Sequence, residues 1–196
     1  MKVLFVVLSY LVGAIPTGYL AYRLSERKDI REQGSRNTGA TNVMRLKGWK
    51  LAVPVVIIDI LKGFLPAFLA VRLFADPRLA LVSPFMAVVG HCYPVYIRFR
   101  GGKGVATAVG AAAAVSLVPL LLCAVVFVVV VGLTRYVSLG SILAVTALPG
   151  LALILGGGTE TVLWGLAIAA IIVFRHRGNI GRLLAGRERK LGEKAI

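Results

Sequence analysis

The sequence predicts an all-α integral membrane protein, and three observations support that prediction. Hydrophobic residues make up 58% of the 196 residues and charged residues only 16%, which is too little charge to cover a soluble domain. Several apolar runs approach or exceed the roughly 20 residues that a helix needs to cross a bilayer. The positive charges gather between those runs, as they do in cytoplasmic loops. We therefore predict a single polytopic membrane domain over residues 1–196.

Six apolar runs follow one another along the chain. They are Val3–Tyr22, Leu51–Phe74, Leu79–Ile97, Val105–Leu133, Val137–Leu155 and Thr161–Phe174. The first run is too long for the apolar part of a signal peptide, and no small-x-small cleavage site closes it, so we expect a spanning helix. The basic linker that follows it, Arg23–Lys50, is expected in the cytoplasm, which places the N-terminus outside.

The fourth run decides the number of spans. If Val105–Leu133 crossed once, the basic tail from Arg175 would lie outside, against the positive-inside rule. Pro119 lies near the middle of that run and removes a helical hydrogen bond. We therefore expect two short helices that meet near Ser116–Pro119 and return the chain to the cytoplasm at Arg135. The result is seven transmembrane helices, with the N-terminus outside and the C-terminus cytoplasmic.

This topology accounts for the net charge of +15. Such a charge could indicate nucleic-acid binding. Here, however, every lysine and arginine falls in a predicted cytoplasmic segment except Lys2, Lys62, Arg72 and Arg78. The charge therefore indicates orientation in a membrane, and we expect no nucleic-acid partner.

Three predicted cytoplasmic segments are too rich in glycine, amides and basic side chains to be simple connections. They are Gly34–Arg45, Arg98–Thr107 and Arg175–Glu188. In the second, glycines surround Lys103 just before an apolar helix begins at Val105. Glycine backbone, a helix N-terminus and an ammonium group together favour a phosphate, with a flexible basic turn as the alternative. The spacing is not that of a nucleotide-binding P-loop.

The other two segments have helical signals. Thr41 or Asn42 could cap a short helix that carries Arg45 in its first turn. His176 and Asn179, followed by an arginine at the same spacing, would share one face of a helix. Each pattern also fits an ordinary cap or a basic face against lipid headgroups. The density of polar groups beside a membrane favours a polar ligand.

Ionisable groups also interrupt the apolar runs. Asp59 and Lys62 lie three residues apart, and because intramembrane charges are costly we expect them to pair on the bundle-facing side. His91, inside the third run, is expected to be a hydrogen-bonded structural residue. The sequence shows no Ser–His–Asp or Cys–His set. With 8 acidic residues and 2 histidines, and with Cys92 and Cys123 at no metal-like spacing, we expect no metal site.

These segments resemble the bacterial acyl-phosphate:glycerol-3-phosphate acyltransferases, the PlsY family. Arg36 and Thr38 depart from the first family motif, in which Gly and often Pro stand. The order and spacing of the motifs make the resemblance specific. The motifs are GAIPTGYL (13–20), GSRNTGATNV (34–43), DILKG (59–63), GHCYPVYIRFRGGKGVAT (90–107), RYVSLGSI (135–142) and RHRGNIGRLLAGRE (175–188).

The resemblance implies a seven-helix bundle that acylates the 1-hydroxyl of glycerol 3-phosphate with a fatty acyl phosphate. The products are 1-acylglycerol 3-phosphate (lysophosphatidic acid) and phosphate, and this is the first step of phospholipid synthesis. We expect no cofactor, membrane lipid as the only other partner, and a monomer. The expected location is the bacterial inner membrane, with the active site on the cytoplasmic face.

The resemblance also implies which residues act. The glycine loop with its lysine is expected to hold one phosphate. An arginine, a serine, a histidine and an asparagine are expected to hold the other, and which phosphate goes where stays open. Attack is expected to be direct, with the proton passing to acyl phosphate and His176 as the alternative base. The expected catalytic residues are Ser35, Asn37, Arg45, Lys103, His176 and Asn179, and the expected substrate-binding residues are Thr41, Asn42, Gly101, Gly102, Gly104, Val105, Thr107 and Ser141.

Two other classes of protein are disfavoured. An organic-anion transporter would show broken helices at mid-membrane and inverted repeats, and no such repeat is seen. A polyprenyl-phosphate transferase would be expected to show Asp-rich Mg²⁺ sites, which 8 acidic residues hardly allow.

Cysteine labelling tests the predicted topology. In a background without Cys92 and Cys123, a cysteine at Arg135 should label from the cytoplasm and one at Gly157 from outside, because one predicted span separates them. Labelling of both positions from the same side would contradict the seven-helix arrangement.

Overall fold

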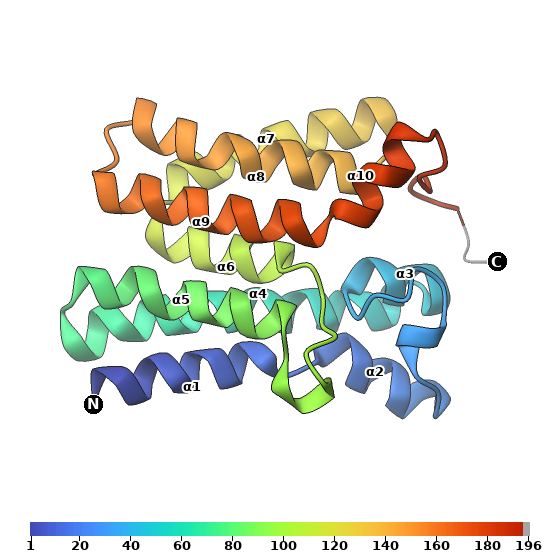
Figure 1. Cartoon of the computed structure of the whole chain (residues 1–196), viewed down its shortest axis with the longest axis horizontal. Coiled ribbons are helices and arrows are strands. Elements are labelled where there is room, and N and C mark those ends of the chain that lie inside the picture. The colour runs from blue at the N-terminus through green and yellow to red at the C-terminus, as the bar shows by residue number, and fades with distance from the viewer. Residues whose placement is uncertain (194–196) are drawn as a thin grey trace. The chain divides into compact units, whose positions relative to one another are not determined.

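The computed structural model describes residues 1–193, and no strand occurs in that range (Figure 1). Lys194, the last basic residue of the predicted cytoplasmic tail, lies outside the described residues. The helices are α1 (Lys2–Ala14), α2 (Thr17–Glu26), α3 (Ala40–Lys47), α4 (Trp49–Phe74), α5 (Pro77–Cys92), α6 (Val105–Val115), α7 (Leu117–Thr134), α8 (Val137–Ile154), α9 (Thr159–Arg175) and α10 (Arg177–Leu184), with 3-10 turns η1 (Ile30–Glu32) and η2 (Val95–Ile97).

Five described segments are long and apolar enough to cross a membrane: α1 with α2, α4, α5 with η2, α7 and α8. The pair α9 and α10, bent by 61°, is a sixth if it counts as one span, and α6 is a shorter apolar helix. The predicted all-α membrane protein is therefore confirmed. The count of seven spans and their orientation stay predictions.

The break in the fourth apolar run lies at Ser116, three residues before Pro119. A proline ring clashes with the carbonyl four residues earlier, which here belongs to Val115, the last residue of α6. Pro119 itself lies in the first turn of α7, where its missing N–H is not needed. The prediction of two short helices was wrong for the second one, because α7 has 18 residues and can span alone.

A second break, at Ile15 and Pro16, divides the first apolar run into α1 and α2. Sequence analysis predicted a spanning helix there and did not predict the break, although the two helices together still form one candidate span. The carbonyl of Ile15 would be exposed by this break, but it accepts hydrogen bonds from the backbone N–H of Thr17 (3.0 Å) and from the ammonium of Lys62 (2.8 Å). The break is thus stabilised by a charged side chain of α4.

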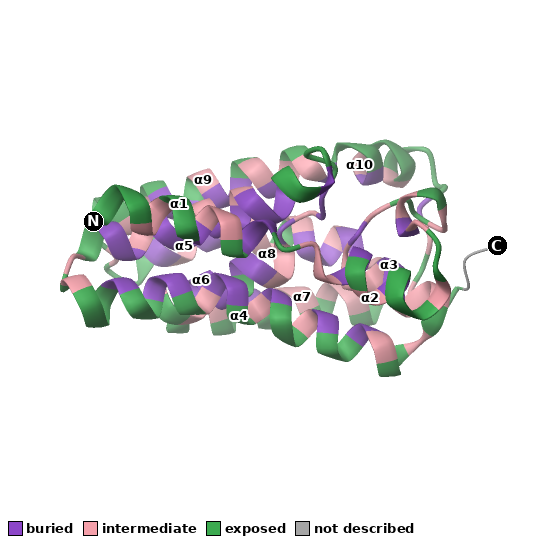
Figure 2. Ribbon diagram, turned by 90° about the horizontal axis from the view of Figure 1, so that it is seen from below, coloured by how far each residue is buried: buried purple, intermediate pink, exposed green. Residues whose placement is uncertain are grey.

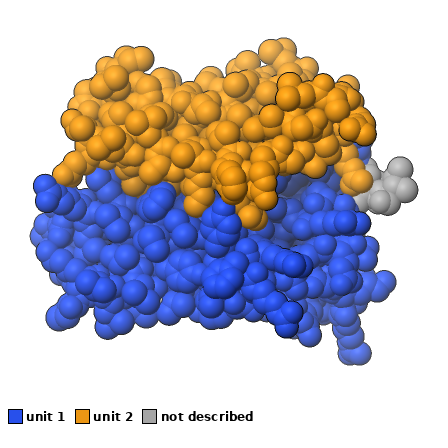
Figure 3. All heavy atoms as spheres, in the orientation of Figure 1, with its two compact units in different colours: residues 1–111, 192–196 blue, residues 112–191 orange. Residues whose placement is uncertain are grey.

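The chain divides into two compact units, coloured separately in Figure 3: residues 1–111, with the chain end from Gly192, and residues 112–191. In unit 1, helices approach so closely that a side chain would not fit. A Cβ on Gly63 of α4 would lie 1.8 Å from the carbonyl oxygen of Thr107, and one on Gly110 of α6 would lie 1.8 Å from that of Ile60. Small residues allow this packing between membrane helices.

Unit 2 is built from α7, α8, α9 and α10. Gly140 of α8 lies against Phe127 and Val131 of α7, and Gly165 of α9 lies against Pro149 of α8. The long helices carry buried residues along one face and exposed residues along another (Figure 2). The exposed residues of α7 are largely valine and leucine, as expected of a face that contacts lipid.

Candidate functional site

The first polar segment of unit 1 is wound around the side chain of Asn42, which is only 1% exposed. Its Oδ1 accepts a hydrogen bond from the backbone N–H of Ser35 (2.9 Å), and its Nδ2 donates to the carbonyls of Gln33 (3.1 Å) and Asn37 (2.9 Å). Asn37 in turn accepts from the N–H of Gly39 through Oδ1 (2.8 Å). The side chain of Asn42 is therefore committed to holding the loop.

The helix that carries Asn42 begins earlier than predicted. α3 is capped by Gly39, without a side-chain cap hydrogen bond, so the prediction of a cap at Thr41 or Asn42 was wrong. Both residues lie in the first turn, because Asn42 is drawn into the loop instead of capping the helix. Arg45 lies in the last turn, not in the first. The exposed Ser35 stands on the same loop, beside the residues that Asn42 fixes.

Arg36 has a backbone φ of 57°, in the left-handed region that glycine adopts most easily. This conformation explains why glycine is expected at that position in the family motif. The loop keeps its shape with arginine there, since the neighbouring peptides are held by Asn42.

The glycine loop leads directly into α6. Gly101, Gly102 and Gly104 are buried, while Lys103 between them is partly exposed. Gly104 has a φ of 84°, and its carbonyl accepts from the N–H of Ala108 (2.8 Å), so it stands at the helix start. Val105 is the first residue of α6, and Thr107, two residues later, is fully buried. A loop of this kind offers backbone N–H groups, a helix N-terminus and one ammonium group to an anion.

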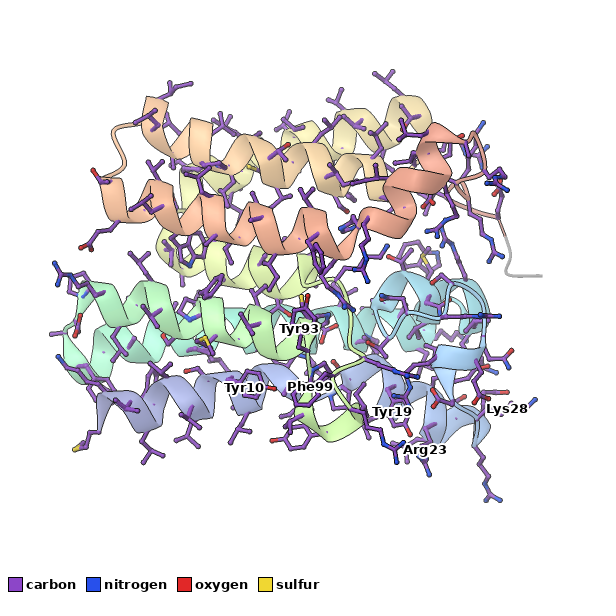
Figure 4. All side chains as sticks on the ribbon, viewed as in Figure 1. Tyr10, Tyr19, Arg23, Lys28, Tyr93 and Phe99 are labelled. Carbon is purple, nitrogen blue, oxygen red and sulfur yellow. The ribbon has the colours of Figure 1, made fainter. Side chains whose placement is uncertain are left out.

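The segment before the glycine loop is tied to the N-terminal helices. The hydroxyl of Tyr10 on α1 donates to the carbonyl of Tyr93 (2.8 Å), and both residues are labelled in Figure 4. Arg31 of η1 donates to the carbonyl of Ile97 (3.0 Å) and stacks over the ring of Tyr19. These contacts fix the entry to the loop.

The predicted pair of Asp59 and Lys62 is confirmed: the ammonium lies 2.7 Å from the carboxylate, and both side chains are buried in unit 1. His91, expected to be a structural residue, lies beside this pair, with its Nδ1 3.4 Å from the Lys62 ammonium.

In unit 2, His176 stands at the bend between α9 and α10 and is only 2% exposed. Its Nδ1 lies 2.8 Å from the carbonyl oxygen of Ile172. A carbonyl oxygen can only accept, so Nδ1 is the donor in this contact. In the neutral ring, Nε2 therefore carries no proton and acts as a hydrogen-bond acceptor.

Glu188 organises the second polar cluster. Its Oε1 accepts from Asn179 Nδ2 (2.6 Å) and from Ser138 Oγ (2.8 Å), and its Oε2 accepts from Arg182 Nε (2.7 Å). Burial raises the pKa of the Glu188 carboxyl, but these hydrogen bonds outweigh burial and hold its pKa below the ordinary value. Because a carboxylate only accepts, the amide of Asn179 is oriented with its oxygen away from Glu188.

Ser138 and Glu188 were missed as site residues by sequence analysis. Ser138 stands one turn before Ser141 on α8, and both are buried; that three-residue spacing was the available signal. Ser141 donates to the carbonyl of Val137 (2.8 Å), which leaves its oxygen lone pairs as acceptors. The tail after Glu188 is anchored by Leu191, whose N–H and carbonyl pair with the carbonyl and guanidinium of Arg135 (2.7 and 2.8 Å).

The predicted residues therefore gather in two sets. Unit 1 holds Ser35, Asn37, Thr41, Asn42, Arg45, Gly101, Gly102, Lys103, Gly104, Val105 and Thr107, and unit 2 holds Ser141, His176 and Asn179. Among residues 1–193, no three His, Cys, Asp or Glu side chains are grouped as a metal site would need.

Comparison with known proteins gives one consistent family. The sequence pattern of the family described as glycerol-3-phosphate acyltransferase matches residues 3–186. The chain is 46% identical to the glycerol-3-phosphate acyltransferase of Syntrophotalea carbinolica over 184 residues, covering 93% of each protein. It is 41% identical to that of Thermoanaerobacter pseudethanolicus over 192 residues, covering 98% of this chain and 96% of the relative.

Two solved structures are also similar. One is the glycerol 3-phosphate form of PlsY (YgiH), an integral membrane glycerol 3-phosphate acyltransferase, with a TM-score of 0.93, 41% identity and coverage of 97% of this chain and 96% of that one. The other is the lysophosphatidic acid form of PlsY, with a TM-score of 0.89, 39% identity and coverage of 97% and 95%.

The role of Glu188 can be tested by Glu188→Gln, which keeps the shape but replaces one acceptor oxygen by an amide donor. The variant should lose about 1–3 kcal/mol of unfolding free energy, the cost of a buried partner left unsatisfied. The lowered pKa fixes the pH dependence: the stabilisation is present above the ordinary Glu pKa and is lost as pH falls through the folded pKa.

Thermal unfolding in detergent, measured from neutral to acidic pH, should show the wild type approaching the variant as pH falls. Glu193→Gln, at the exposed end of the described tail, serves as the matched control. A difference between wild type and Glu188→Gln that stays constant with pH would contradict this role.

Proposed function

The chain belongs to the glycerol-3-phosphate acyltransferase family, and we propose that it transfers a fatty acyl group from an acyl phosphate to the 1-hydroxyl of glycerol 3-phosphate. It is an integral membrane acyltransferase with several spans. The observation that carries the proposal is the glycine loop with Lys103 at the start of α6, in a fold that PlsY also has in its glycerol 3-phosphate and lysophosphatidic acid forms.

The reaction needs little chemistry from the protein. The 1-hydroxyl oxygen forms a bond to the acyl carbonyl carbon, the bond from that carbon to the phosphate oxygen breaks, and the hydroxyl proton leaves with the phosphate. An acyl phosphate is a mixed anhydride, so the leaving group is already activated. The main tasks are to hold two anions close, to align the hydroxyl and to stabilise the negative charge that develops on the carbonyl oxygen.

Unit 1 supplies the hydrogen-bond donors. Backbone N–H groups of the loop from Gly101 to Val105, apart from that of Gly102, which donates to the His91 carbonyl, hold a phosphate together with the Lys103 ammonium. Arg45 adds a guanidinium, which suits phosphate oxygens because its donors form a planar fork. Ser35, on the loop that Asn42 fixes, orients the reacting groups.

Unit 2 offers acceptors, and for two residues we therefore propose a role other than the phosphate binding that sequence analysis expected. Glu188 accepts from the Asn179 amide nitrogen, so the amide oxygen of Asn179 points away from that carboxylate, and His176 in its neutral form has Nε2 as an acceptor. Neither atom suits a phosphate oxygen, because two acceptors repel each other. We assign both residues, with Ser141, to the hydroxyl groups of glycerol 3-phosphate.

The transfer proceeds without an acyl-enzyme. The phosphate of the donor is a base within reach of the attacking hydroxyl, so it can take the proton directly. Ser35 then positions substrate without becoming acylated, and the fatty chain lies among the helices or in lipid. The enzyme acts as a monomer without cofactor in the bacterial inner membrane, with this chemistry on the cytoplasmic face.

The donor can be tested with the purified protein and glycerol 3-phosphate. Acyl phosphate should support lysophosphatidic acid formation in chelator, whereas acyl-CoA and acyl carrier protein should not. Lys103→Ala serves as the control that the measured activity comes from the proposed site. With acyl phosphate it should lower kcat/KM by a factor that corresponds to about 2–4 kcal/mol. Activity with acyl-CoA equal to that with acyl phosphate, or a need for Mg²⁺, would contradict the proposal.

The proton path can be tested at His176. Glutamine can still donate to the Ile172 carbonyl and present an oxygen as acceptor, but it is not a comparable base. His176→Gln should therefore retain more activity than His176→Ala and keep the wild-type pH profile of kcat. If His176 were the general base, glutamine would be as poor as alanine and an acidic limb of the profile would disappear.

A further inference from the structure

Unit 1 contains a buried polar network that the proposed reaction does not use. The ammonium of Lys62 contacts Asp59 Oδ1 (2.7 Å), the carbonyl of Ile15 (2.8 Å), Thr17 Oγ1 (3.2 Å) and His91 Nδ1 (3.4 Å). The hydroxyl of Thr17 donates to Asp59, and His91 Nδ1 lies 3.6 Å from the same carboxylate. The network thus joins the break between α1 and α2 to the helices α4 and α5.

Stability alone is a weak reason for such a network. Removing two charges from water is costly, and a buried ion pair can often be replaced by apolar residues without loss of stability. The side chains of Asp59 and Lys62 are 2% and 4% exposed, and each has partners within the chain. The network is therefore not an open ligand site. Besides stabilising the break at Ile15 through Lys62, it has one member that contacts a segment with a proposed function.

That member is His91, which lies directly against the glycine loop. Its carbonyl accepts a hydrogen bond from the N–H of Gly102 (3.0 Å). A Cβ placed on Gly102 would lie 2.0 Å from Nε2 of the His91 ring, with two ring carbons as the next nearest atoms. One edge of the imidazole, Nδ1, thus faces the ion pair, and the opposite edge, Nε2, faces the loop.

We propose that His91 is a positioning residue for the phosphate-binding loop. The network of Thr17, Asp59 and Lys62 fixes the imidazole, and the imidazole sets the path of the backbone at Gly102. This path aims the loop N–H groups and Lys103 at the anion. The inference rests on the proposed function, because it takes the ligand of the loop to be a substrate phosphate.

Glycine at position 102 follows from the same contact. A methyl group there would collide with the imidazole, which is itself held by the ion pair and cannot move aside freely. The φ of Gly102 is not in the left-handed region, so alanine is excluded by the ring and not by backbone strain.

A double-mutant cycle tests this contact. Gly102→Ala should raise the KM for one of the two phosphorylated substrates by roughly tenfold or more, with a smaller change in kcat, because the loop is displaced. His91→Ala removes the ring that the methyl group would meet. The double variant should therefore have the same KM as His91→Ala alone. The effects of the two substitutions on KM would then be coupled by roughly 5- to 100-fold.

Gly101 provides a matched control in the adjacent residue. A Cβ on Gly101 would lie 2.2 Å from the backbone oxygen of His91 and 2.3 Å from Cδ of Pro94. Neither atom is removed by His91→Ala, so Gly101→Ala should stay equally impaired in that background. A ring that merely supports the fold would give no such difference between neighbouring glycines.

The other end of the network gives an independent readout. Asp59→Asn keeps the size of the side chain but removes the charge that pairs with Lys62. In the wild-type background it should raise the same substrate KM that Gly102→Ala raises. In the His91→Ala background it should change that KM little, because its influence passes through the imidazole ring. His91→Asn replaces His91→Ala in both tests if the alanine variant does not fold, as judged by its melting temperature in detergent.

The outcomes separate the two proposals. Additive effects of Gly102→Ala and His91→Ala, with Lys103→Ala still raising a substrate KM, would overturn the positioning role and leave the phosphate loop intact. If Lys103→Ala left both KM values unchanged, the phosphate role of the loop itself would be wrong. The positioning role is supported if Gly102→Ala no longer raises the KM in the His91→Ala background while Gly101→Ala still impairs the enzyme there.

Discussion

The structure depends on one constraint, which is that hydrocarbon cannot satisfy the hydrogen bonds of the backbone. Helices meet the constraint along the spans, so irregular backbone must find partners within the protein. The break between α1 and α2 shows how this is done. Ile15 turns its carbonyl to the Lys62 ammonium (2.8 Å), and Lys62 is neutralised by Asp59 (2.7 Å). A charge in the span is therefore the means by which a helix can be interrupted there.

The same constraint shapes the two polar clusters. Each is organised by a buried polar side chain whose own atoms are largely taken up by the chain. Asn42 holds three backbone groups of the first loop, and Glu188 holds three side chains of the second cluster. Such residues cost desolvation unless every atom is paired, and the pairing makes their neighbours rigid. The groups proposed to meet substrate are thus placed by residues whose own atoms are taken up by the chain.

Much of the fold could be predicted from local sequence, because helix breaks and apolar runs are local features. Pro119 predicted a break to within a few residues, and the spacing of Asp59 and Lys62 predicted their ion pair. Pro16 is the same kind of signal at the break between α1 and α2, but sequence analysis did not use it. Glu188 was not assigned. Two of its partners, Asn179 and Arg182, are near in the sequence, but Ser138 lies 50 residues away and only the folded chain brings it to the carboxylate.

Sequence analysis proposed which residues form the site, but it could not predict the direction of each polar group. A sequence identifies an amide or an imidazole without showing which atom its neighbours occupy. Glu188 takes an N–H of the Asn179 amide, and the Ile172 carbonyl takes Nδ1 of His176, so the amide oxygen of Asn179 and, in the neutral ring, Nε2 of His176 are acceptors. An acceptor held rigidly repels a phosphate oxygen and attracts a hydroxyl. Orientation by neighbours thus makes these atoms acceptors, which is the reason for proposing hydroxyl groups of glycerol 3-phosphate, and not its phosphate, as their ligands.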